Sequence, residues 1–152
     1  MIASWSSAKI HVTDAEIPPR VLVIDDEPLV RWSLVAGLRH AGFDAVSAGT
    51  SEDARALARE APPPLVVLLD VGLWGVDPRE LLASIRHSAP GCRVLLLAVE
   101  GQDVCAMDDV EVIRKPFDLH AVVVRVIAAL PYLRCDSWAA RTIASSEAVS
   151  SE

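Results

Sequence analysis

The feature that most constrains this chain is an uninterrupted apolar run, residues 65–69, that ends directly in Asp70. Because no polar position interrupts the run, it is typical of a strand buried on both faces of a parallel sheet. A carboxylate that follows such a strand lies at the carboxyl edge of the sheet, where open α/β sheets bind their ligands. The run therefore predicts a fold class and, at the same time, the place of a site.

Two other stretches end in charged residues in the same way. The apolar run 21–24 is followed by Asp25 and Asp26, and the stretch 110–114 is followed by Lys115. Three strand ends would thus supply three carboxylates and one ammonium. Carboxylate oxygens suit Mg²⁺, and with one divalent cation the charges of these groups sum to about zero. The pattern predicts one metal-assisted site that accepts a phosphoryl group.

The rest of the chain alternates between predicted strands and helices. Helices are expected to begin near Pro28, Thr50, Asp77 and Asp118, where first-turn prolines or capping side chains stand. Strands are expected at 20–24, 43–48, 65–69, 93–99 and 110–114. This alternation predicts an α/β fold, with a parallel sheet, helices on both faces and right-handed crossovers.

Composition narrows the class of protein further. With 152 residues, of which 52% are hydrophobic, the chain can bury a sizeable core. Its net charge of -7 argues against direct contact with nucleic acid. The three cysteines have no zinc-ligand spacing, and we interpret them as reduced thiols of a cytoplasmic protein. We expect no membrane segment, since no apolar stretch approaches the roughly 20 residues that span a bilayer, and we see no secretory signal.

Prolines mark the expected domain boundaries. The pair Pro18-Pro19 resists both helix and strand, so the domain is expected at 20–131, after a leader at 1–19 that is disordered or holds a short edge strand. A tail rich in Ser, Ala and Glu, residues 132–152, is expected to be partly helical or disordered.

With Asp25-Asp26, Asp70 and Lys115-Pro116-Phe117 in this order, residues 20–131 resemble the receiver domain of two-component response regulators. The stretch 30–34 is most similar to receivers of enhancer-binding, nitrogen-regulation-type regulators. The resemblance implies a flavodoxin-like, doubly wound sheet of five parallel strands in the order 2-1-3-4-5.

The resemblance also implies a role for each residue of the motifs. Asp70 would accept a phosphoryl group, Lys115 would contact the phosphoryl oxygens, and the Lys115–Pro116 peptide bond would be cis. The ligands of Mg²⁺ would be the carboxylates of Asp25, Asp26 and Asp70 and the backbone carbonyl of Gly72. The implied partners are a histidine kinase or histidine phosphotransfer protein, a downstream protein, and a second copy of the chain. Such a domain is not an enzyme beyond assisting its own phosphorylation and dephosphorylation.

The chain departs from the family at the positions that usually switch. Receivers carry Thr or Ser where this chain has Ala98, and an aromatic residue or His where it has Val112. The stretch 100–111 must also hold two loops and the family's fourth helix, although an average helix alone takes about 11–12 residues. We therefore expect that helix to be shortened or missing, and with it the family's usual output and dimer face.

Two functions remain open from the residues alone. The leading hypothesis is a stand-alone, phosphorylatable receiver that acts as an adaptor or relay protein, because we see no room for an output domain after residue 131. The rival is a pseudo-receiver, an interaction module that does not switch conventionally, which Ala98 and Val112 favour. A haloacid-dehalogenase-type phosphatase would need a second acid where Gly72 stands. A flavodoxin-like cofactor binder would need a phosphate-cradling loop where Asp25 and Asp26 stand.

Overall fold

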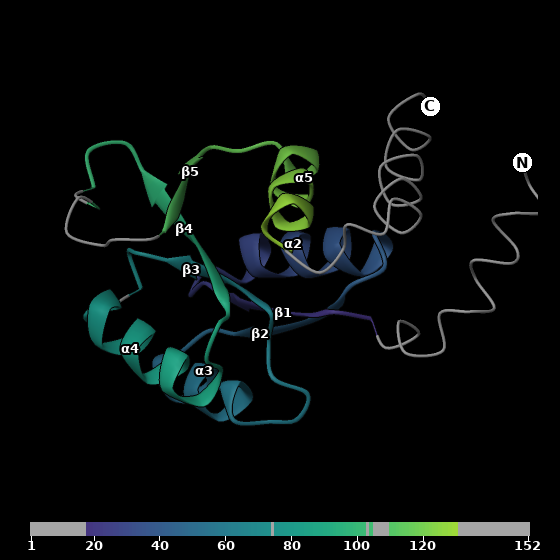
Figure 1. Ribbon diagram of the computed structural model, residues 1–152. Helices are drawn as coiled ribbons and strands as arrows, with labels where there is room; N and C mark the ends of the chain where they lie inside the picture. Colours follow the sequence, from purple (N-terminus) through teal and green to yellow (C-terminus); the bar gives the residue numbers. More distant parts are fainter. Residues whose placement is uncertain (1–17, 74, 103, 105–109, 131–152) are drawn as a thin grey trace, which may run out of the picture.

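A computed structural model describes residues 18–73, 75–102, 104 and 110–130 of the chain. Its centre is a parallel sheet of five strands in the order β2-β1-β3-β4-β5, which confirms the predicted doubly wound topology (Figure 1). The strands are β1 (Arg20–Ile24), β2 (Asp44–Ala48), β3 (Val66–Asp70), β4 (Arg93–Val99) and β5 (Glu111–Lys115). The helices in the described part of the chain are α2 (Pro28–His40), α3 (Ser51–Ala58), α4 (Pro78–Ser88) and α5 (Leu119–Ala129).

Two strands end one residue later than their apolar runs predict. Asp70 is the last residue of β3, in register with Leu97 of β4, and Lys115 is the last residue of β5, in register with Val99. The expected bounds of 65–69 and 110–114 were therefore wrong by one residue at each end. The reason is that main-chain pairing with β4 continues past the last apolar side chain, and the charged residues complete the ladder.

The sheet is buried on both faces by helices. In Figure 1, α2 and α5 cover one face, and α3 and α4 cover the other. Alternate residues of each strand enter two separate cores: Leu68 packs under α2 and α5, whereas Leu69 packs under α3 and α4. All five residues of β3 are buried, as the uninterrupted apolar run predicted.

The helices begin where the sequence placed their caps. The side chains of Thr50, Asp77 and Asp118 accept hydrogen bonds from backbone N–H groups in the first turns of α3, α4 and α5. The helix α2 starts at Pro28, whose missing N–H costs nothing in a first turn. The starts of α2, α4 and α5 set the lengths of the loops that follow β1, β3 and β5, next to Asp25, Asp70 and Lys115.

The connection between β4 and β5 differs from the other crossovers. Among its described residues, 100–102, 104 and 110, there is no helix. This agrees with the expectation that the family's fourth helix is shortened or missing, as far as the described residues reach. Most of the expected leader (1–19), the tail (132–152), Cys105 and Cys135 lie outside the described residues. None of the helices described has the length and apolar character needed to cross a bilayer.

Candidate functional site

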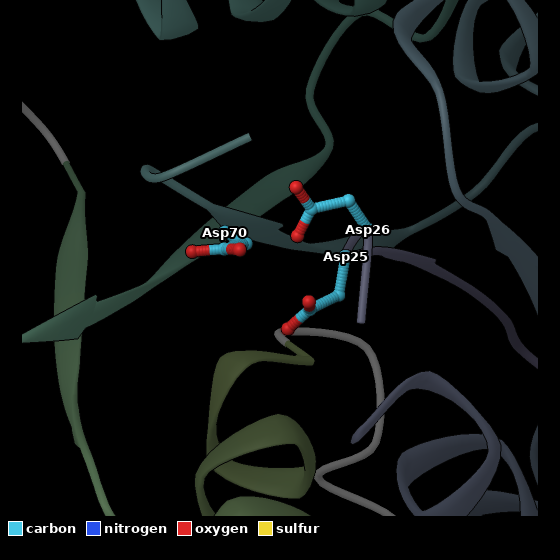
Figure 2. Close-up of side chains that lie close together, drawn as sticks. All are labelled: Asp25, Asp26 and Asp70. Atoms are coloured by element: carbon cyan, nitrogen blue, oxygen red, sulfur yellow. The ribbon is translucent and has the colours of Figure 1, made fainter. Parts of the chain in front are cut away.

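Three strands deliver charged side chains to one edge of the sheet. Asp25 and Asp26 follow β1 directly, Asp70 ends β3, and Lys115 ends β5. Figure 2 shows the three aspartates close together, and a carboxylate oxygen from each lies within 4.8 Å of the others. Because β1 and β3 are parallel neighbours and β5 lies two strands from β3, their ends meet at the carboxyl edge.

Asp25 is the most firmly held of the three aspartates. It is fully buried, and its Oδ2 accepts a hydrogen bond from Nζ of Lys115 at 3.0 Å, while its Oδ1 accepts one from the backbone N–H of Glu27 at 3.0 Å. Its backbone carbonyl accepts a hydrogen bond from the Arg31 guanidinium at 2.8 Å. A buried charge is tolerated only when it is paired and hydrogen-bonded, and Asp25 meets both conditions.

Asp70 belongs to the same cluster and is almost fully buried. Its Oδ1 accepts a hydrogen bond from the backbone N–H of Gly72 at 3.0 Å, and its Oδ2 lies 3.7 Å from Nζ of Lys115. Burial raises the pKa of Asp70, and the nearby Asp25 and Asp26 carboxylates raise it further, outweighing the Gly72 hydrogen bond and the Lys115 charge. The ionised form of Asp70 is thus disfavoured in the protein without a cation.

Lys115 bridges the two buried carboxylates. Burial acts to lower the pKa of Lys115, but the hydrogen bond to Asp25 and the charges of Asp25 and Asp70 outweigh it, so the pKa is raised above its ordinary value. The ammonium is therefore kept charged at the edge of the sheet. The peptide bond that follows it, Lys115–Pro116, is cis.

The donor set fits Mg²⁺. With Lys115 charged, the three aspartates leave an excess of about two negative charges, which a divalent cation would neutralise. All the donors are oxygens, and Asp26 is exposed, so the cluster opens to solvent on that side. Mg²⁺ binds in proteins through one or two carboxylates and keeps several waters. A partly open acidic cluster leaves room for those waters. The part expected of the Gly72 carbonyl stays a prediction.

The two positions expected to be degenerate, Ala98 and Val112, lie on β4 and β5. Ala98, fully buried, stands one residue beyond the β4 position that pairs with Asp70. Val112 is paired with Leu96 in the sheet and packs against the core under α3 and α4. Neither side chain carries a hydrogen-bond donor. Trp74, in the loop after β3, lies outside the described residues.

One residue near the site was not predicted from the sequence. Gln102, in the loop after β4, accepts a hydrogen bond at its Oε1 from the backbone N–H of Val99 at 2.8 Å. Its Nε2 lies 2.9 Å from the point that a Cβ on Gly72 would occupy. The only available signal was compositional, because Gln102 is the single glutamine of a chain that has no asparagine.

Sequence comparisons find response regulators among the proteins that are similar to this chain. The family model of the response regulator receiver domain matches residues 21–127. The probable transcriptional regulatory protein TcrX of Mycobacterium tuberculosis is 38% identical over 119 residues, which are 74% of this chain and 50% of TcrX. The transcriptional regulatory protein KdpE of the same species is 33% identical over 117 residues, 72% of this chain and 50% of KdpE. The chain thus spans about half the length of these relatives.

Solved structures agree in fold. The receiver domain of the hybrid histidine kinase CckA is 27% identical, with a TM-score of 0.64, and the match covers 73% of this chain and 98% of that domain. The chemotaxis protein CheY4 of Vibrio cholerae, at 21% identity, shares the fold with a TM-score of 0.66 over 74% of this chain and 99% of its own. Taken with the match over residues 21–127, these likenesses show that the chain belongs to the response regulator receiver domain family.

Proposed function

We propose that this receiver domain accepts a phosphoryl group on Asp70 from a histidine kinase or histidine phosphotransfer protein, with Mg²⁺ held by Asp25, Asp26 and Asp70. One observation carries the proposal: the three carboxylates lie within 4.8 Å of one another, with the Lys115 ammonium 3.0 Å from Asp25 and 3.7 Å from Asp70. Membership of the family supplies the class of phosphodonor. The domain is a signalling module rather than an enzyme.

The residues of the site divide the chemistry among them. A carboxylate oxygen of Asp70 forms a bond to phosphorus as the phosphorus–nitrogen bond of the donor's phosphohistidine breaks, and the leaving imidazole keeps the electron pair and takes a proton from solvent. Lys115 lies where it can neutralise the equatorial oxygens, which is most of what phosphoryl transfer requires. Mg²⁺ held by Asp25, Asp26 and Asp70 would supply further positive charge to the transferred group. Asp25 holds Lys115 in position through their hydrogen bond.

The test is mass spectrometry of the protein after treatment with acetyl phosphate and Mg²⁺. We expect one added phosphoryl group on the wild type and none on Asp70→Asn, which keeps the shape of the side chain and removes its nucleophilic charge. Asp53→Asn is the matched control, since Asp53 is an exposed carboxylate in the first turn of α3. It should be phosphorylated like the wild type. Phosphoryl incorporation that persists in Asp70→Asn would refute the assignment.

A pseudo-receiver is the second candidate, and Ala98 and Val112 are the observations that favour it. A ligand shifts a conformational equilibrium only through contacts that differ between the two states. Without the usual hydroxyl and aromatic side chains, phosphorylation is expected to change this domain less than an ordinary receiver. Amide spectra recorded with and without beryllofluoride distinguish the candidates. Changes that reach β5 and α5 indicate a switching receiver, and changes confined to the loops around Asp70 and Lys115 indicate the second candidate.

We propose that the domain passes its signal in the cytoplasm to a protein partner, as an adaptor or relay protein, rather than by contacting nucleic acid itself. The net charge of -7 supports this, because backbone phosphates would be repelled. The relatives are transcriptional regulators, and this chain covers only about half of their length. The proposal predicts that the phosphorylated chain does not shift a DNA fragment in a gel, whereas a shift would contradict it.

A further inference from the structure

We propose that the side-chain amide of Gln102 donates a hydrogen bond to the phosphoryl group on Asp70, in the role that a Thr or Ser hydroxyl would otherwise take. The inference rests on the proposed function, since it requires that Asp70 accepts a phosphoryl group. It concerns a residue that belongs to none of the sequence motifs. Three features of the structure carry it: the position of the amide nitrogen, its orientation, and the bare backbone at Gly72.

The amide nitrogen lies beside the acceptor carboxylate. The point that a Cβ on Gly72 would occupy is 2.9 Å from Nε2 of Gln102, 3.4 Å from Oδ1 of Asp70 and 3.9 Å from Oδ2. This point is therefore close to both the amide nitrogen and the carboxylate. Because residue 72 is glycine, no side chain occupies it. A phosphoryl group built on Asp70 would enlarge the acceptor and bring its oxygens closer to surrounding donors.

The side chain of Gln102 is anchored through its oxygen, and among the described residues its nitrogen has no hydrogen-bond partner. Its Oε1 accepts the Val99 backbone N–H at 2.8 Å, and the Gln102 backbone N–H donates to the Val99 carbonyl at 3.2 Å. The Arg114 guanidinium donates to the carbonyls of Val99 and Gln102, at 3.2 and 3.4 Å. Since the oxygen of the carboxamide is already used, the two N–H donors of Nε2 are left to face the Gly72 side.

The charge balance of the site calls for such a donor. An aspartyl phosphate carries close to two negative charges where the carboxylate carried one, so phosphorylation leaves the site more negative even with Lys115 and a divalent cation in place. Ala98 cannot donate a hydrogen bond, and it stands where the family usually supplies one. Gln102 is four residues further along the chain and reaches back to the same edge through its hydrogen bond to Val99.

The composition of the chain makes the test direct. A chain with one glutamine and no asparagine has a single side-chain carboxamide, so its ¹⁵N–¹H spectrum holds one such NH₂ pair, which Gln102→Ala identifies by removing it. We expect beryllofluoride with Mg²⁺ to move one proton of this pair downfield, as a new hydrogen bond to fluoride forms. If beryllofluoride binds, as backbone amides around Asp70 report, and the NH₂ pair does not move, the proposal is wrong.

Variants provide an independent measurement. Because a hydrogen bond to a charged group is involved, Gln102→Ala should bind beryllofluoride about 10-fold to 100-fold more weakly than the wild type. Gln102→Glu keeps the acceptor for Val99 but adds a negative charge, so it should bind more weakly still. Glu100→Gln, an exposed neighbour in the same loop, is the control and should match the wild type.

The two proposals fail in different ways. Equal beryllofluoride affinity in the wild type and in Gln102→Ala overturns the role of Gln102 and leaves the proposed function standing. A wild-type protein that binds no beryllofluoride in the presence of Mg²⁺ overturns the proposed function, and the role of Gln102 with it.

Discussion

The substitution Asp70→Asn should stabilise the protein in the absence of divalent cations, although it removes the proposed phosphoacceptor. Asp70 is buried close to two other carboxylates, and its burial together with their charges raises its pKa. Its ionised form therefore costs folding free energy at neutral pH. Asparagine has the same shape, and its carbonyl oxygen can still accept the Gly72 N–H that Oδ1 accepts at 3.0 Å.

The size of the effect follows from the distances. An oxygen of each of the other two carboxylates lies no more than 4.8 Å from one of Asp70, and at that limit, with an effective dielectric constant of about 20, each pair repels by about 3.5 kcal/mol. At 3.7 Å, Lys115 attracts Asp70 by about 4.5 kcal/mol. Two repulsions thus exceed one attraction, and solvent around the exposed Asp26 screens part of the excess. We expect a net stabilisation of about 1–2 kcal/mol, or a rise in Tm of about 4–8 °C.

The difference in Tm is measured by thermal melting in buffer with a chelator, with circular dichroism as the signal. Titration with Mg²⁺ should reverse this difference, so that the wild type has the higher Tm. The wild type gains about 1.4 kcal/mol for each tenfold rise in Mg²⁺ above its Kd, whereas Asp70→Asn, with one anionic ligand fewer, gains less. The pKa of Asp70 is higher in the folded protein than in the unfolded chain, so its protonated form favours folding. This favourable contribution is complete below the unfolded pKa and is lost as the pH rises through the folded pKa. The difference without Mg²⁺ should therefore shrink as the pH falls toward about 4.

The control is Asp53→Asn, which removes the same charge from an exposed position in the first turn of α3, where the lost interaction with the helix dipole should lower stability by no more than about 1 kcal/mol. A fall in Tm for Asp70→Asn without Mg²⁺ would show that attraction to Lys115 outweighs the repulsion and would refute the electrostatic reasoning. Equal Mg²⁺ responses in the wild type and Asp70→Asn would count against Asp70 as a ligand.

Three further predictions follow from the core and the degenerate positions. Leu68→Ala, which opens a cavity under α2 and α5, should lower the free energy of unfolding by about 2–5 kcal/mol in urea titrations, and a loss below 1 kcal/mol would contradict the packing described. Burial raises the pKa of the Cys92 thiol, so maleimide should label Cys92 much more slowly in the native protein at pH 7 than in urea, as peptide mapping can measure; equal rates would be inconsistent with its burial. Ala98→Thr combined with Val112→Tyr should extend the spectral changes caused by beryllofluoride into β5 and α5. An unchanged response would show that the connection between β4 and β5, rather than these two side chains, limits the conformational change.

Much of the fold could be predicted from the sequence because its signals are local. The run 65–69 indicates a strand covered on both faces, and β3 is buried along its whole length. Capping residues such as Thr50 indicate helix starts, since a side chain that satisfies a free N–H needs only its own turn. Strand ends were less predictable. Asp70 and Lys115 belong to the sheet because β4 pairs with them, and an apolar run does not contain that information.

The candidate site was likewise predictable only in part from the sequence. The sequence by itself indicated that Asp25, Asp70 and Lys115 stand at or within one residue of the ends of β1, β3 and β5, because a charged residue next to an apolar run needs no partner to be recognised. Only the tertiary structure decided that the Lys115 ammonium lies 3.0 Å from Asp25, or that Gln102 reaches the surroundings of Asp70. The physical reason is that such contacts depend on the parallel register of separate strands and on the path of the loop after β4. Both are set by packing between segments far apart in the chain.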